Sequence, residues 1–142
     1  MKQLLIAVVL VGVASALAHL HVVAQMYYPV VRVESPEGVV FTAVHEPTSE
    51  RAACALANGE FLAPFKDLCQ ECKVVAARCE RQLESFEAAI TSHEGIPHPL
   101  VFAPGVRLAI AGPGDVARAM CDEIARTSPR SDVRCVPPRK PV

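Results

Sequence analysis

The alternation of apolar and polar residues predicts a β-hairpin at the start of the main domain. Val31 and Val33 alternate with charged neighbours over residues 30–34, so one face of this run is covered by protein and the other meets water. A second β-rich run covers residues 39–44. The residues between the runs, Ser-Pro-Glu-Gly, have the proline and glycine of a tight turn. We therefore expect two antiparallel strands joined by this turn.

Apolar residues at steps of three and four predict two helices after the hairpin. The first is short, has Thr48 or Ser49 as a candidate cap, and stops at Asn58 and Gly59. The second covers residues 64–91 and carries one apolar stripe that includes several cysteines. At 1.5 Å per residue it would extend roughly 40 Å, more than a domain of this size covers. A homodimer through residues 64–91 is therefore one expectation.

The last third of the chain has the pattern of a strand pair, a helix and a strand. PLVF and VRLAIAG are strand-like, DVARAMCDEIART is an amphipathic helix with Asp115 as its cap, and SDVRCV is a closing strand. This ending resembles that of small peptidoglycan-binding domains over this stretch alone, and the resemblance implies no site residue.

The order of these elements predicts an α+β fold. We expect a small, mostly antiparallel sheet made of the N-terminal hairpin and the C-terminal β-α-β unit. A disulfide-linked helical pair would cover this sheet on one side, and an N-terminal hydrophobic helix would precede it.

The apolar run at the N-terminus is typical of an export signal. Lys2 precedes it, and Ala16-Leu17-Ala18 has the small residues that precede a cleavage site. The apolar character continues, however, so that residues 4–24 also fit an uncleaved inner-membrane anchor. Either alternative leaves the remainder outside the cytoplasm, either periplasmic or secreted. We expect residues 1–24 to be the signal or anchor, 28–136 a single extracytoplasmic domain, and 137–142 a flexible proline-rich tail.

An even number of cysteines in an exported chain predicts structural disulfides. The six are Cys54, Cys69, Cys72, Cys79, Cys121 and Cys135. In an antiparallel helix pair Cys54 and Cys69 would stand level, so we expect them to be bonded. On one helix, Cys72 and Cys79 would be about 10.5 Å apart, too far for a mutual bond, so their partners must lie elsewhere. Cys121 and Cys135 would either bond each other or reach back to these two.

The Cys69-Gln70-Glu71-Cys72 motif also suggests thiol exchange or metal binding. A reactive pair normally begins a helix, whereas this one lies inside the predicted helix beside Asp67 and Glu71, which favour the neutral thiol. A zinc site would need a second ligand pair at suitable spacing, and no other Cys-x-x-Cys is present. We predict no catalytic residue, no cofactor and no metal ligand.

The charge of the chain limits the class of molecule that it can bind. The formal net charge of −1 argues against nucleic acid as a partner. Residues 126–142 nevertheless carry five cationic residues against Asp132, a balance of +4, which is either an ordinary solvated tail or a contact for an anionic envelope partner.

The sequence therefore predicts a non-catalytic, disulfide-stabilised extracytoplasmic domain that binds another protein or an envelope polymer. The alternative is a thiol-disulfide oxidoreductase or metal-binding accessory factor that uses Cys69 and Cys72.

Overall fold

The computed structural model describes residues 13–17, which are helical, and residues 25–139. Most of the predicted signal or anchor and the end of the predicted tail lie outside the described residues. No helix in these two described ranges has the length and apolar character of a membrane span.

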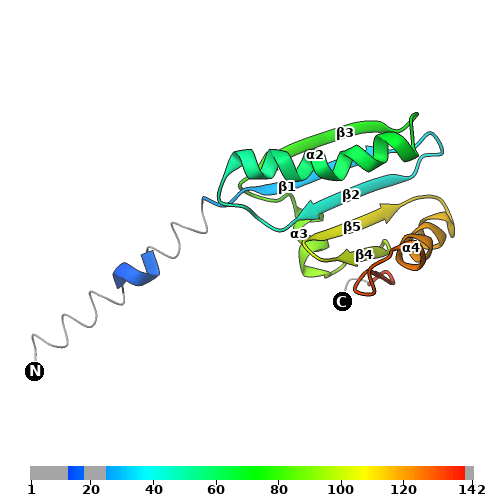
Figure 1. Cartoon of the computed structure of the whole chain (residues 1–142). Helices are drawn as coiled ribbons and strands as arrows, with labels where there is room; N and C mark the ends of the chain where they lie inside the picture. Colours follow the sequence, from blue (N-terminus) through cyan, green and yellow to red (C-terminus); the bar gives the residue numbers. More distant parts are fainter. Residues whose placement is uncertain (1–12, 18–24, 140–142) are drawn as a thin grey trace, which may run out of the picture.

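Six strands form one antiparallel sheet in the order β3-β1-β2-β5-β4-β6 (Figure 1). The strands are β1 (Tyr28–Glu34), β2 (Val40–His45), β3 (Lys73–Glu80), β4 (Leu100–Ala103), β5 (Val106–Ala111) and β6 (Arg134–Val136). The predicted hairpin is present as β1 and β2. Its turn closes where Val39 N–H donates to the Ser35 side chain at 3.2 Å, and Gly38 takes the left-handed φ of 79°.

Helices lie on both faces of the sheet. α2 (Arg51–Leu68) covers the β3 side of one face, and α4 (Val116–Thr127) covers the β6 side of the same face. α3 (Ser85–Ser92) packs on the opposite face. The α+β fold class is confirmed, whereas the expectation that helices cover only one side is wrong.

The alternation within each strand divides the core into two clusters. Under α2 and α4 lie alternate residues such as Val31, Phe41 and Ile110. Under α3 lie their neighbours, such as Val30 and Val44, together with Ile90 of the helix itself. Because both faces of the central strands are buried, their apolar runs are almost continuous.

The predicted helix over residues 64–91 is wrong. Its first residues belong to the end of α2, residues 73–80 form β3, and α3 begins only at Ser85. The apolar residues of this stretch do not form one stripe. Phe65 packs on one face of the sheet and Phe86 on the other. The long helix on which the homodimer was based is therefore not present.

The predicted end of the first helix is also wrong, because α2 runs through Asn58 and Gly59 to Leu68. Asn58 is buried, and its side-chain amide donates to the main-chain oxygen of Arg78 at 3.0 Å. This long-range bond gives the buried amide nitrogen a partner, at a residue type that elsewhere sometimes ends a helix. The helix also begins differently, with Glu50 at the N-cap and no side-chain cap bond.

The C-terminal strand-helix-strand order is as predicted. β5 leads through α4 to β6, and β4 lies between the two strands in the sheet. Asp115 occupies the N-cap of α4 as expected, although its side chain makes no cap hydrogen bond.

Candidate functional site

All six cysteines form disulfides. The pairs are Cys54–Cys79, Cys69–Cys72 and Cys121–Cys135, with Cα–Cα distances of 6.0, 5.3 and 5.4 Å. These distances lie within the usual range for disulfides. The expectation of a fully disulfide-bonded domain is thus met by the structure.

The expected Cys54–Cys69 bond is wrong. It rested on an antiparallel helix pair, but a single helix, α2, contains residues 54–68 and carries the two cysteines apart. Cys54 is instead bonded to Cys79 on β3, and Cys69 to Cys72. Cys121 and Cys135 are bonded to each other, which was one of the two alternatives.

The two longer bridges have equivalent places at opposite edges of the sheet. Cys54 on α2 is tied to the edge strand β3, and Cys121 on α4 is tied to the other edge strand β6. Both helical cysteines are fully buried. Each helix that covers this face is therefore covalently held to the strand at its own edge.

The Cys69–Cys72 bridge closes the turn between α2 and β3. Cys69 N–H still donates to Phe65 O at 2.8 Å, so the motif lies at the carboxyl end of α2. The helix dipole is negative at this end, and Glu71 adds an acidic side chain within the turn. Both disfavour a thiolate, the opposite of what a reactive Cys-x-x-Cys requires.

The histidines near prolines pack against aromatic rings. His45 ends β2 and meets Phe61 edge-on at 5.3 Å between centroids, and burial lowers the pKa of His45 below its ordinary value. His93 ends α3 in the left-handed region, with a φ of 57°, and meets Phe102 at 5.2 Å. His98 packs edge-on against a ring of α3. These positions give the three rings packing roles.

Arg107, Phe102 and Arg134 form a row across three strands, which we call the cationic row. Phe102 on β4 is the direct register partner of Arg107 on β5 and of Arg134 on β6. The Arg107 guanidinium carbon lies 3.8 Å from the Phe102 ring centroid, and that of Arg134 lies 5.2 Å from it. Both distances are within the range of cation–π attraction.

The cationic row has unbalanced positive charge. Neither Arg107 nor Arg134 has an ion pair with an acidic residue in the described part of the chain. Asp132 lines the same depression of roughly 390 Å³, but Arg130 binds both of its carboxylate oxygens, at 3.1 and 3.2 Å. Two neighbouring guanidiniums without a counter-ion can bind a carboxylate or phosphate group.

The basic residues near the C-terminal end do not form one patch in the structure, because they have different partners. Arg126 pairs with Glu123 and Arg130 with Asp132, whereas Arg134 belongs to the cationic row. Phe102 and Arg107 were not among the binding residues expected from the sequence. The available signal was Arg107 itself, a charged residue inside an otherwise apolar strand run.

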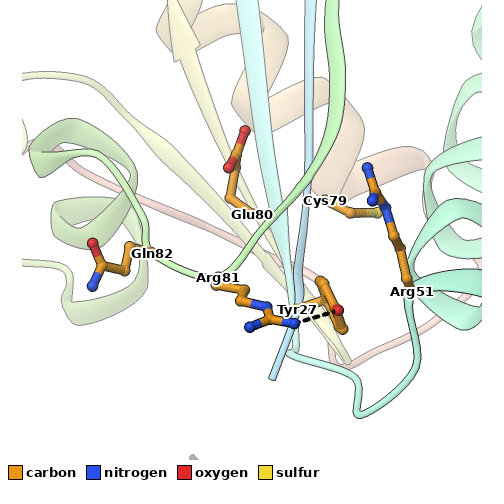
Figure 2. Close-up of a pocket in the computed structure, with 6 residues that line it drawn as sticks. All are labelled: Tyr27, Arg51, Cys79, Glu80, Arg81 and Gln82. Carbon is orange, nitrogen blue, oxygen red and sulfur yellow. Dashed lines mark hydrogen bonds between the residues drawn. The ribbon is translucent and has the colours of Figure 1, made fainter. Parts of the chain in front are cut away.

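A second depression lies where β1 begins, and Tyr27, Arg51 and Arg81 line it (Figure 2). Arg81 donates a hydrogen bond to the Tyr27 hydroxyl oxygen at 2.9 Å. The hydrogen bond and charge of Arg81, together with the charge of Arg51, lower the pKa of Tyr27 below its ordinary value.

No cluster of three or more metal-ligating side chains occurs within residues 13–17 and 25–139. No protein-family model matches the chain, and no curated protein or solved structure matches it. The function must therefore be argued from the geometry of the site itself.

Proposed function

We propose that the protein is a non-catalytic binding domain that works outside the cytoplasm and holds an anionic group of an envelope polymer or a partner protein on the cationic row. The observation that carries this proposal is the pair of arginines stacked on Phe102 without an acidic partner. A guanidinium placed over an aromatic ring is already partly oriented, so an incoming anion orders fewer side-chain rotamers.

The disulfides support the location. Three bridges in a chain of 142 residues are typical of proteins that fold in an oxidising compartment, since cytosolic thiols are kept reduced. The N-terminal apolar run predicts the same compartment from the sequence.

Binding to matched polymers tests the partner class. The full, oxidised chain is titrated with polygalacturonate, with polyphosphate and with neutral dextran at constant ionic strength. We expect Arg107→Gln and Arg134→Gln each to weaken binding of the polyanion by at least about tenfold, because each removes charge-assisted hydrogen bonds. Dextran should not bind.

Arg118→Gln is the matched control. Arg118 is an exposed arginine on α4, 67% accessible at its side chain, whose contact with Asp122 is 4.0 Å long. Its loss removes the same charge at a site outside the cationic row. If all three variants weaken binding equally, the attraction is a general charge effect and the proposal is wrong.

One observation favours the alternative, a thiol-disulfide oxidoreductase. The Cys-x-x-Cys motif does form its own disulfide, in a turn where both cysteines are partly exposed. An insulin-reduction assay with wild-type protein and a Cys69→Ser, Cys72→Ser variant tests it. Turnover that depends on these two residues would support the alternative, and equal low rates would remove it.

A further inference from the structure

The depression beside Tyr27 brings together three side chains from separate parts of the chain. Tyr27 precedes β1, Arg51 is the first residue of α2, and Arg81 follows β3. This open depression has a volume of roughly 740 Å³. Figure 2 shows Arg81 and Tyr27 joined by their hydrogen bond, with Arg51 rising from α2 on the other side of Tyr27.

Main-chain hydrogen bonds and a disulfide hold the backbone that carries these side chains. Tyr27 exchanges two main-chain hydrogen bonds with Thr48, at 2.7 and 2.8 Å. The Cys54–Cys79 disulfide ties the first turn of α2 to the end of β3, close in sequence to both Arg51 and Arg81. The main-chain positions of the two arginines are thus fixed before any ligand arrives, so that binding has to order only their side chains.

Positive charge in this depression is not neutralised. Arg51 and Arg81 have no ion pair with an acidic side chain within the described residues. Glu80 lines the cavity, but its carboxylate points away from Tyr27 in Figure 2 and lies 3.2 Å from Arg78 Nε.

The start of α2 adds to this field. Its first turn contains no acidic residue, and the Glu50 side chain makes no cap hydrogen bond. The positive end of the helix dipole therefore acts in the same direction as the two arginines.

The environment of Tyr27 shows the sign of the local field. The same arginines that would contact a ligand lower the pKa of Tyr27, so this depression stabilises a negative oxygen. Because the phenol oxygen already accepts from Arg81, the phenol hydrogen is free to donate to a ligand.

We infer that Tyr27, Arg51 and Arg81 form an oxyanion-binding site for a single carboxylate or phosphate group. Each guanidinium can place two parallel N–H donors on such a group, and the phenol adds a further donor. This site is separate from the cationic row, and neither proposal depends on the other.

Tyr27 itself provides the measurement. The chain has two tyrosines and no tryptophan, so Tyr28→Phe leaves Tyr27 as the single strong fluorophore. In this background the full, oxidised chain is titrated with glycerol phosphate and, separately, with galacturonate, at constant ionic strength. We expect a saturable change in Tyr27 fluorescence with at least one of them. The tighter ligand distinguishes a phosphate-bearing source from a uronate-bearing one.

The variants decide whether the site is the one described. Arg51→Gln and Arg81→Gln should each weaken binding by at least about tenfold. Arg118→Gln and Arg107→Gln remove one arginine elsewhere and should leave the affinity within about twofold. Arg107→Gln also separates the two proposals, because it should impair only the cationic row.

A second measurement follows the tyrosine proton by absorbance. We expect saturating ligand to raise the pKa of Tyr27 in the Tyr28→Phe background, because the bound anion offsets the two arginines. Arg81→Gln should raise it without ligand. The inference is wrong if neither anion gives saturation, if all four arginine variants weaken binding equally, or if the bound ligand leaves the titration of Tyr27 unchanged.

Discussion

A disulfide holds each edge strand of the sheet, but the two edge strands differ in how many residues they pair with their neighbours. At each edge a disulfide joins the outer strand to the helix above it, Cys54–Cys79 at β3 and Cys121–Cys135 at β6. β3, however, has seven register partners on β1, whereas β6 has three on β4. A disulfide therefore reinforces a long hydrogen-bonded ladder at one edge, and at the other it holds a strand too short to stay paired unaided.

An ion pair and a hydrogen bond also hold the β3 edge strand. Arg78 on β3 forms an ion pair with the buried carboxylate of Glu87 on α3, and its main-chain oxygen accepts from Asn58 on α2. A bulge interrupts the pairing of β3 with β1 beside Val74, where the neighbouring Val75 is 54% exposed. Bulges of this kind discourage pairing with another chain at an open edge.

The largest effect is expected from breaking the ion pair. Arg78→Leu leaves the Glu87 carboxylate buried without its charged partner, which should lower the free energy of unfolding by about 3 to 5 kcal/mol. Urea denaturation measures this. Arg118→Gln, at an exposed pair, should change stability by less than about 0.5 kcal/mol. Equal effects would mean that the Arg78 pair does not hold this edge.

The second-largest effect is expected from removing the disulfide at the β3 edge. The Cys54–Cys79 bond spans 25 residues, so replacing both cysteines by alanine should cost about 3.5 kcal/mol in the chain-entropy description. Urea denaturation of the double variant checks this. A loss below about 1 kcal/mol would show that the ladder with β1 suffices without the bridge.

Removing the bridge at the β6 edge should lower the free energy of unfolding slightly less than removing the one at the β3 edge. It should, however, loosen its own edge strand more. Its separation of 14 residues corresponds to about 3 kcal/mol for the Cys121→Ala, Cys135→Ala variant. Because β6 has few pairs, its amides should also lose hydrogen-exchange protection well before those of β1. Uniform loss of protection across the sheet would contradict the distinction between the edges.

The Cys69–Cys72 bridge should matter least of the three. It spans 3 residues and therefore constrains the unfolded chain weakly, by about 1.6 kcal/mol. Chemical denaturation of the Cys69→Ala, Cys72→Ala variant provides the comparison. A loss as large as that of either long bridge would show that this turn has a role in holding α2 to β3.

The smallest effect concerns pH. Burial lowers the pKa of His45, so the unfolded chain binds this proton more readily than the folded one. Stability should therefore fall as the pH drops through about 6.5. Denaturation at about pH 7.5 and about pH 5 measures the fall, and His45→Gln should reduce it. An unchanged pH dependence in this variant would assign the fall to other groups.

Local patterns in the sequence predicted the two hairpin strands and the C-terminal strand, helix and strand. They failed over residues 64–91, where spacings of three and four suggested one helix. Such spacings also arise when a strand and a helix follow each other, and only packing shows that Phe65 and Phe86 lie on opposite faces of the sheet.

The candidate sites were less predictable than the fold. Phe102 and Arg107 are near neighbours in the chain, but Arg134 joins them only because β6 pairs with β4. Similarly, Arg51 and Arg81 face one depression because α2 and β3 are held together by Cys54–Cys79.

By itself, the sequence determined the fold class and that the cysteines would pair, since periodicity and composition act through neighbouring residues. The tertiary structure decided which cysteines pair and which arginines meet, because these depend on strand order. Strand order is set by the burial of whole faces, a property that no short segment carries.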